Sequence, residues 1–75
     1  MKTQGERIRE IRTLLNLSQE ELGKIFNTSK QYISKLENNL VQLNNAKMVI
    51  LAEIYNVNIN YILTGKGSMF ISTVD

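Results

Sequence analysis

Five polar residues that favour helix starts divide this chain into short helical segments. Thr3 and Ser18 each precede a glutamate by three residues, which is the capping-box pattern of a helix N-terminus. Three further apolar runs follow Ser29, Asn44 and Asn58, which are also of the residue types found most often at N-caps. Within the segments, apolar residues recur three or four positions apart, as on one face of an α-helix. The sequence therefore predicts an all-α fold, and 75 residues have room for one domain.

Two of these segments lie within residues 19–38 and are joined by a short turn. Gly23 lies inside the first helix, where a glycine costs about 0.5–1 kcal/mol relative to alanine, and its missing side chain would let the next helix cross closely. Asn27 lies in the turn and tolerates the left-handed conformation of a tight reversal. The inward positions are Leu22, Phe26, Ile33 and Leu36, which leaves Lys30, Gln31, Ser34 and Lys35 outside. This pattern indicates a helix-turn-helix. In the preceding helix, the inward face is expected to hold Ile8, Ile11, Leu14 and Leu15.

The composition argues against catalysis and against metal binding. The chain has no cysteine and no histidine, so it lacks the commonest nucleophilic thiol, general base and transition-metal ligands. Glu20 and Glu21 are neighbours on a helix and point about 100° apart, so they are poor candidates for a catalytic pair. No apolar run approaches the roughly 20 residues that span a bilayer, and the N-terminus is not a signal peptide. We therefore expect no enzyme, no catalytic or metal-binding residue, no cofactor and no membrane partner.

Positive charge is concentrated in the first half of the chain, although the net charge is only +2. The basic residues of that half are Lys2, Arg7, Arg9, Arg12, Lys24, Lys30 and Lys35. This half also holds the helix-turn-helix segment. A local excess of this kind suits contact with phosphates, as well as an ordinary solvated surface.

The stretches LSQEELGKIF, TSKQYISKLEN and LAEIYNVNINYILTG resemble, in order and spacing, the lambda-repressor-like (XRE-type, phage Cro/C1-type) helix-turn-helix family of DNA-binding domains. The resemblance covers residues 5–65. It implies a compact five-helix bundle over residues 1–67, followed at residues 68–75 by a loosely ordered C-terminal tail or the start of a linker. It also implies an ion pair between Arg12 and Glu37, and Arg12 does lie among apolar residues where an unpaired charge would be costly.

The family also implies which side chains contact double-stranded DNA. The base-contacting positions correspond here to Ser29, Lys30, Gln31, Ser34 and Lys35. The backbone-contacting candidates are Ser18, Gln19, Lys24 and Asn38, with Gln19 also able to support the side chain at Lys30. Lysine suits guanine O6 and N7, and glutamine suits adenine N6 and N7. The implied location is the cytoplasm of a bacterial or phage-infected cell, at the nucleoid.

The loop after the helix-turn-helix departs from the family pattern. The family commonly has glycine, basic residues and proline there, whereas residues 39–43 read NLVQL. With the next helix, this loop offers the apolar residues Leu40, Val41, Leu43, Val49, Ile50 and Ile54. An exposed patch of this kind marks a partner surface, and we expect a homodimer interface. The alternative is that some of these residues complete a small core.

The function expected from the resemblance is a sequence-specific transcriptional regulator that binds DNA. We expect a repressor that binds a palindromic operator as a dimer, with the third helix in the major groove. Two alternatives stay open: the antitoxin of a toxin–antitoxin pair, and a protein-interaction module that uses residues 40–43. The chain is either a natural minimal repressor or a fragment of a longer one.

Overall fold

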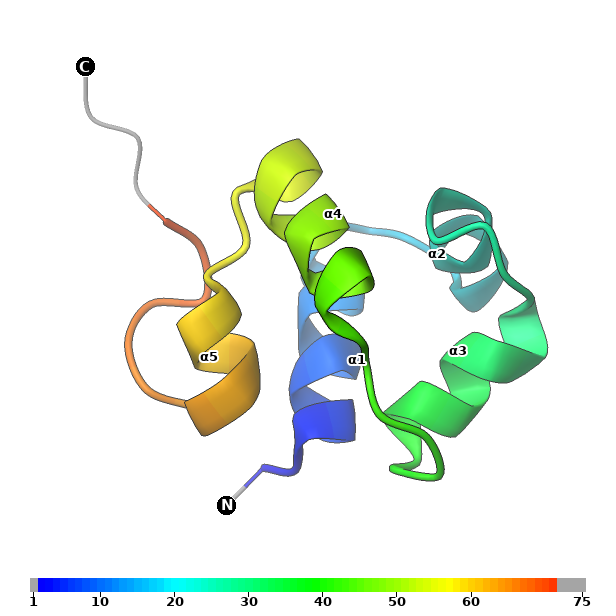
Figure 1. Ribbon diagram of the computed structural model, residues 1–75, viewed down its shortest axis with the longest axis horizontal. Helices are drawn as coiled ribbons and strands as arrows, with labels where there is room; N and C mark the ends of the chain where they lie inside the picture. The colour runs from blue at the N-terminus through cyan, green and yellow to red at the C-terminus, as the bar shows by residue number, and fades with distance from the viewer. Residues whose placement is uncertain (1, 72–75) are drawn as a thin grey trace.

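The predicted N-caps do begin the helices. The computed structural model describes residues 2–71 (Figure 1). The helices are α1 (Gln4–Leu14), α2 (Gln19–Ile25), α3 (Lys30–Glu37), α4 (Asn45–Tyr55) and α5 (Ile59–Thr64). Helix α1 packs against both α3 and α5, and α4 lies in front of α1 in this view. The all-α, five-helix prediction is confirmed, and pairing of strand type within residues 2–71 is limited to one isolated bridge.

Asparagine residues end the first four helices. Asn16, Asn27, Asn39 and Asn56 have φ between 56° and 63°, the left-handed region in which glycine is the usual occupant. After each of the first three asparagines, the backbone N–H of the next residue donates to a carbonyl of the preceding helix, as in a Schellman motif. One such hydrogen bond runs from Thr28 N to Gly23 O at 2.7 Å. Asparagine is the best substitute for glycine at such a position, because its short polar side chain tolerates the conformation. The chain therefore reverses sharply after each helix with few glycines.

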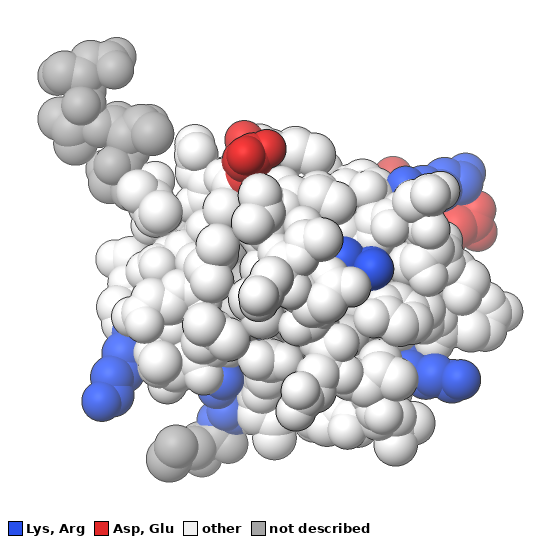
Figure 2. All heavy atoms as spheres, in the orientation of Figure 1, with Lys and Arg blue, Asp and Glu red and all other residues white. Residues whose placement is uncertain are grey.

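The core is formed by one face of each helix together with the loop residues Leu43 and Val57. Its buried apolar side chains are Ile8, Ile11, Leu22, Phe26, Ile33, Leu36, Leu43, Met48, Leu51, Val57 and Ile62. Leu14 is 64% exposed, so its assignment to the inward face was wrong. Leu15, which was also expected on that face, does pack against the core. Charged residues are sparse on the face over α4 and lie mainly near its edges (Figure 2).

The C-terminal segment returns to the bundle. Residues 68–71 were expected to be loosely ordered, but Val57 and Phe70 form an antiparallel bridge. Asn58 N donates to Met69 O at 2.9 Å, and Ile71 N donates to Asn56 O at 2.7 Å. Met69 and Phe70 are partly buried against the core, so apolar contact holds this segment as well. Residues 72–75, the rest of the expected tail or linker, lie outside the described residues.

The start of α1 lies directly against the end of α3. A Cβ on Gly5 would come within 2.5 Å of the carbonyl oxygens of Leu36 and Glu37, so only glycine allows this approach. The Gly5 amide donates to the Asn39 side-chain oxygen at 2.9 Å, and Asn39 Nδ2 donates to Thr3 Oγ1 at 2.9 Å. Asn39 therefore ends α3 and ties it to the N-cap of α1.

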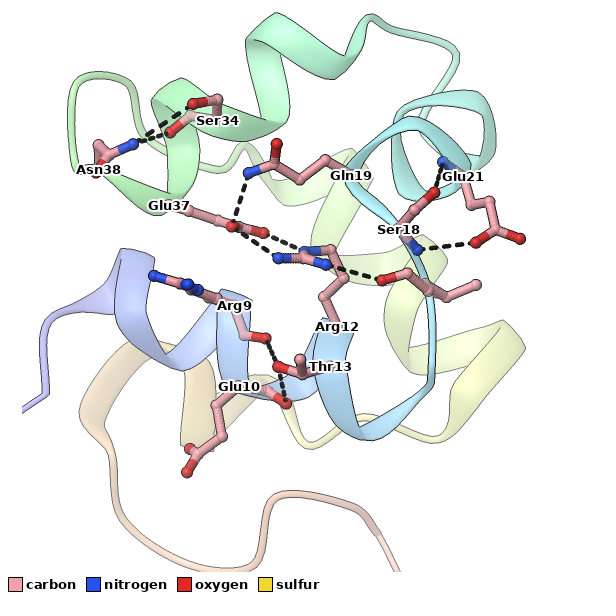
Figure 3. A network of polar contacts seen from close by, with 11 residues as sticks. Arg9, Glu10, Arg12, Thr13, Ser18, Gln19, Glu21, Ser34, Glu37 and Asn38 are labelled. Carbon is pink, nitrogen blue, oxygen red and sulfur yellow. Dashed lines mark hydrogen bonds and ion pairs between the residues drawn. The ribbon is translucent and has the colours of Figure 1, made fainter.

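A buried ion pair links the other end of α1 to α3 (Figure 3). Arg12 Nε donates to Glu37 Oε2 at 2.5 Å, and Nη2 donates to Oε1 at 3.2 Å. Gln19 Nε2 donates to the same Oε1 at 3.1 Å, and Arg12 Nη1 donates to the Leu17 carbonyl at 2.8 Å. The Glu37 side chain is only 4% exposed, so its charge depends on these donors. One carboxylate thus joins α1, the start of α2 and the end of α3.

We predict that Gly5→Ala lowers stability despite the better helix propensity of alanine. Propensity alone would favour alanine by about 0.5–1 kcal/mol. The overlap with two backbone carbonyls is expected to outweigh this gain, for a net loss of about 1–3 kcal/mol in urea unfolding. Gly23→Ala is the matched control, because its nearest contacts are at 3.0–3.1 Å, and it should lose less. A Gly5→Ala variant more stable than the wild type would contradict the contact.

We predict a strongly non-additive double-mutant cycle for Arg12 and Glu37. Either Arg12→Met or Glu37→Met leaves a buried charge unpaired and should cost about 3–5 kcal/mol in unfolding free energy. The double variant should recover a large part of that loss, because no unpaired charge remains. Additive losses in chemical denaturation would show that the two side chains do not interact.

Candidate nucleic-acid interface

The helix-turn-helix unit is formed by α2 and α3 and the turn between them. Ser18 and Glu21 form a complete capping box at the start of α2, and Ser29 accepts from Tyr32 N at the start of α3. Hydrogen bonds from Ser18, the backbone N–H first, hold the pKa of Glu21 below its ordinary value. A Cβ on Gly23 would lie 3.0–3.1 Å from backbone atoms of Ser29, so a side chain there would crowd the point where α3 begins next to α2. These contacts fix the angle between the two helices.

The outer face of α3 carries most of the predicted base-contacting residues. Ser29, Lys30, Gln31 and Lys35 are exposed. Ser34 is half-buried, and its carbonyl accepts from Asn38 Nδ2 at 2.8 Å. The opposite face of the helix, with Ile33 and Leu36, is fully buried, so α3 presents its polar side outward.

Tyr32 lies at the edge of the outer face of α3. It is half-buried, and the ammonium of Lys47 from α4 lies 5.4 Å from the centre of its ring. A cation at this distance from a tyrosine face is weakly attracted to it. The tyrosine ring therefore contacts a side chain from α4.

The predicted backbone-contacting residues lie on α2, at its N-cap and at the end of α3, and all four have a partner within the protein. Ser18 and Asn38 are exposed. Lys24 is exposed and lies 3.7 Å from Glu20, a pair that is worth little in solvent. Gln19 is half-buried, and its amide donates to Glu37, so its contact is with the ion pair and not with Lys30.

A concave depression of about 570 Å³, called the basic depression below, is lined by several of these side chains. Its lining combines α1, the start of α2 and both ends of α3: Arg9, Arg12, Ser18, Gln19, Glu20, Lys30, Glu37 and Asn38. Four of the nine predicted DNA-contacting residues are brought together here, whereas the other five lie outside it: Lys24, Ser29, Gln31, Ser34 and Lys35. Arg9 was counted among the basic residues of the first half but was not assigned to a DNA contact. Its spacing of three residues from Arg12 places both on one side of α1, which is the signal that could have identified it.

The Arg7 side chain bonds within the fold and does not line the basic depression. Arg7 is only 9% exposed, and its Nε donates to the Ile62 carbonyl at 2.9 Å. Nη2 lies 3.4 Å from the Leu63 carbonyl, so the guanidinium caps the C-terminal end of α5, where positive charge is favoured. It lines a second depression of about 410 Å³ with Lys2 and Lys66. The charge of Arg7, which was listed among the basic residues of the first half, is therefore used within the fold.

The predicted partner surface divides into exposed and buried residues. Leu40 is 72% exposed, Ile54 is 59% exposed and Val49 is also exposed, whereas Val41 and Ile50 are half-buried. Leu43 is only 4% exposed and belongs to the core, so its assignment to this surface was wrong. It immediately precedes the Asn44 N-cap, and Met48 four residues beyond that cap is also buried. The two positions are those of a hydrophobic staple, which explains why Leu43 turns inward.

The described part of the chain has neither a metal-binding cluster nor a membrane-spanning helix. Residues 2–71 contain no group of three or more acidic, histidine or cysteine side chains placed to hold a metal ion. None of the helices in that range is long and apolar enough to cross a membrane.

Comparison with known proteins places this geometry in a family. A family model described as helix-turn-helix matches residues 8–62. No curated protein matches the sequence significantly. Among solved structures, the chain is similar to the P22 c2 repressor protein in complex with synthetic operator 9T, determined in the presence of Tl⁺. The two chains are 30% identical, the TM-score is 0.77, and the match covers 88% of this chain and 100% of the other. The chain therefore belongs to the helix-turn-helix family, with the fold of a lambda-repressor-like DNA-binding domain.

Proposed function

We propose that this protein is a sequence-specific transcriptional regulator that reads double-stranded DNA with α3 in the major groove. The observation that carries the proposal is the exposed polar face of α3, with Lys30, Gln31 and Lys35, on the second helix of a helix-turn-helix. A polar helix face is common on any soluble protein. Here it lies beside a depression lined by two arginines and Lys30, and positive side chains of this kind suit the phosphates of a DNA backbone. The similarity to a phage repressor in complex with its operator supports the same conclusion.

Base recognition is assigned to the outer face of α3. Lys30 and Lys35 suit guanine, and Gln31 suits adenine, each discriminating by about 1–3 kcal/mol. Ser29 and Ser34 are further base-contacting candidates, although Ser34 is half-buried and bonded to Asn38. The C-terminal end of α3 is attached to both ends of α1, which keeps these side chains in a fixed register.

Backbone contacts are assigned to residues around α2 and the end of α3. Ser18 and Asn38 are exposed beside the basic depression, and Lys24 stands on the outer side of α2. Gln19 is half-buried, so its part in backbone contact is to hold Glu37 and the start of α2 in place. Phosphate contacts of this kind position the domain without reading sequence.

We propose further that the protein acts as a homodimeric repressor in the cytoplasm. The exposed residues Leu40, Val49 and Ile54, with the half-buried Val41 and Ile50, give an apolar surface on the loop and α4. Charged groups are sparse on the face over α4 (Figure 2). A two-fold dimer would place two α3 helices in half-sites about 34–36 Å apart on a palindromic operator, where the dimer blocks promoter access.

We predict that DNA selected from a random pool will share a palindrome, and that Lys35→Ala will relax the preference at one position of each half-site. Loss of a base contact should cost about 1–3 kcal/mol on the selected sequence and much less on random DNA. Lys24→Ala, which removes the same charge from α2, should weaken binding to both sequences alike. Quantitative binding measurements on the two duplexes check this. Binding with no preference in the wild type would contradict the proposed function.

We predict that Ile54→Glu makes the protein monomeric and weakens operator binding, because a charge in an apolar interface is left desolvated and unpaired. Leu14→Glu is the matched control, since Leu14 is similarly exposed but lies at the end of α1. Sedimentation equilibrium would report the change in mass. A wild-type protein that stays monomeric at every concentration, also on the palindrome, would contradict the dimer.

A further inference from the structure

Arg9 is the arginine of α1 whose charge the fold does not use. The two other arginines of this helix are both occupied: Arg7 by carbonyl groups of α5, and Arg12 by Glu37. Arg9 is exposed, and within residues 2–71 its side chain makes no hydrogen bond and has no carboxylate within ion-pair distance. An arginine without a partner has donors and charge available for a ligand.

The Arg9 side chain lies at the basic depression. It shares the lining with Lys30 from α3 and Asn38 from the end of α3. Figure 3 shows the Arg9 side chain on the side of α1 that faces Glu37, whereas only its backbone carbonyl accepts a hydrogen bond, from Thr13. Two positive side chains from separate helices therefore face one hollow. A flat guanidinium and an ammonium in this arrangement suit an oxyanion with several acceptors.

The buried acid that lines this hollow is already paired, and the exposed acid lies near a lysine. Glu37 accepts from Arg12 and from Gln19, which satisfies the carboxylate oxygens that line the depression. Glu20 lies 3.7 Å from Lys24. The lining has three cations, Arg9, Arg12 and Lys30, and two carboxylates, Glu20 and Glu37, so its net charge is +1 and it favours an anion over a cation.

We propose that Arg9 binds a backbone phosphate of the DNA that α3 reads, and so adds α1 to the interface as a third contacting element. The proposal rests on the proposed function and deepens it. DNA is the ligand that the geometry favours, because Lys30 belongs both to this hollow and to the outer face of α3. A phosphate bound here would lie next to the first base pairs that α3 contacts. Arg12 and Glu37 then connect this anchor rigidly to α3.

The test measures how salt affects DNA binding by the full chain, for the wild type and three variants. Each phosphate contact contributes a slope of about −0.9 to the plot of log K against log[salt]. Arg9→Gln should make the slope shallower by about that amount, on the selected duplex and on a random duplex alike. Between 50 and 200 mM salt, the wild type should then lose about three- to fourfold more affinity than Arg9→Gln. Arg9→Lys should keep the wild-type slope, because it keeps the charge.

Lys66→Gln is the matched control for charge. Lys66 is exposed beside the second depression with Arg7, so this variant should keep the wild-type slope. The urea midpoint of Arg9→Gln should equal that of the wild type, since the side chain has no partner in the fold.

Three results would overturn the proposal. The first is an Arg9→Gln slope equal to those of the wild type and Lys66→Gln, in which case sequence-specific binding stands and only the role of Arg9 fails. The second is a loss confined to the selected duplex, which would make Arg9 a base reader. The third is a wild type that binds neither duplex, in which case the proposed function fails as well.

Discussion

The carboxylate of Glu37 is the group on which the arrangement of the reading helix depends. It is almost fully buried, and such a charge is stable only while its donors stay in place. Those donors come from two directions, Arg12 on α1 and Gln19 at the start of α2. Because Glu37 is the last residue of α3, the network fixes that helix where its polar face turns outward. A buried ion pair of this kind fixes the relative positions of the helices more reliably than it adds stability.

A second constraint acts at the same end of α3 and uses an asparagine where the related domains commonly carry glycine. Asn39 takes the left-handed conformation that ends the helix, with φ of 63°. A glycine would adopt that conformation more cheaply, but it has no side chain to bond with α1. The side chain of Asn39 accepts from Gly5 and donates to Thr3, so helix termination and helix docking are one feature. The apolar loop that follows Asn39 lacks the basic residues that are common at this point in the family.

Much of the fold could be predicted because its signals are local. Capping residues such as Ser18 and Asn44 act on the amides that follow them, so the sequence alone locates the helix starts. Other features depend on contacts between distant segments, which no local signal reveals. Arg7 bonds to carbonyls 55 and 56 residues away, which composition cannot reveal. Leu43 is different, because its position before the Asn44 cap is a local staple signal that was present in the sequence. The pairing of residues 69–71 with residues 56–58 is again non-local.

The three arginines of α1 show how one short helix divides its charge between folding and binding. Arg7 stabilises the end of α5, Arg12 holds the buried carboxylate, and Arg9 has no partner in the described part of the chain. Their spacing of two, then three residues directs Arg7 to the far side of α1 from the other two. A net charge of only +2 therefore understates the positive charge available on one face.

The central claim is that DNA is bound by the face formed by α3 and its neighbours. An NMR titration of the ¹⁵N-labelled protein with its selected duplex tests this claim most directly, because each amide reports its own surroundings. We predict that the largest chemical-shift changes will fall on the start of α2 and on α3. The largest changes on α5 and residues 66–71, with α3 unaffected, would contradict the account.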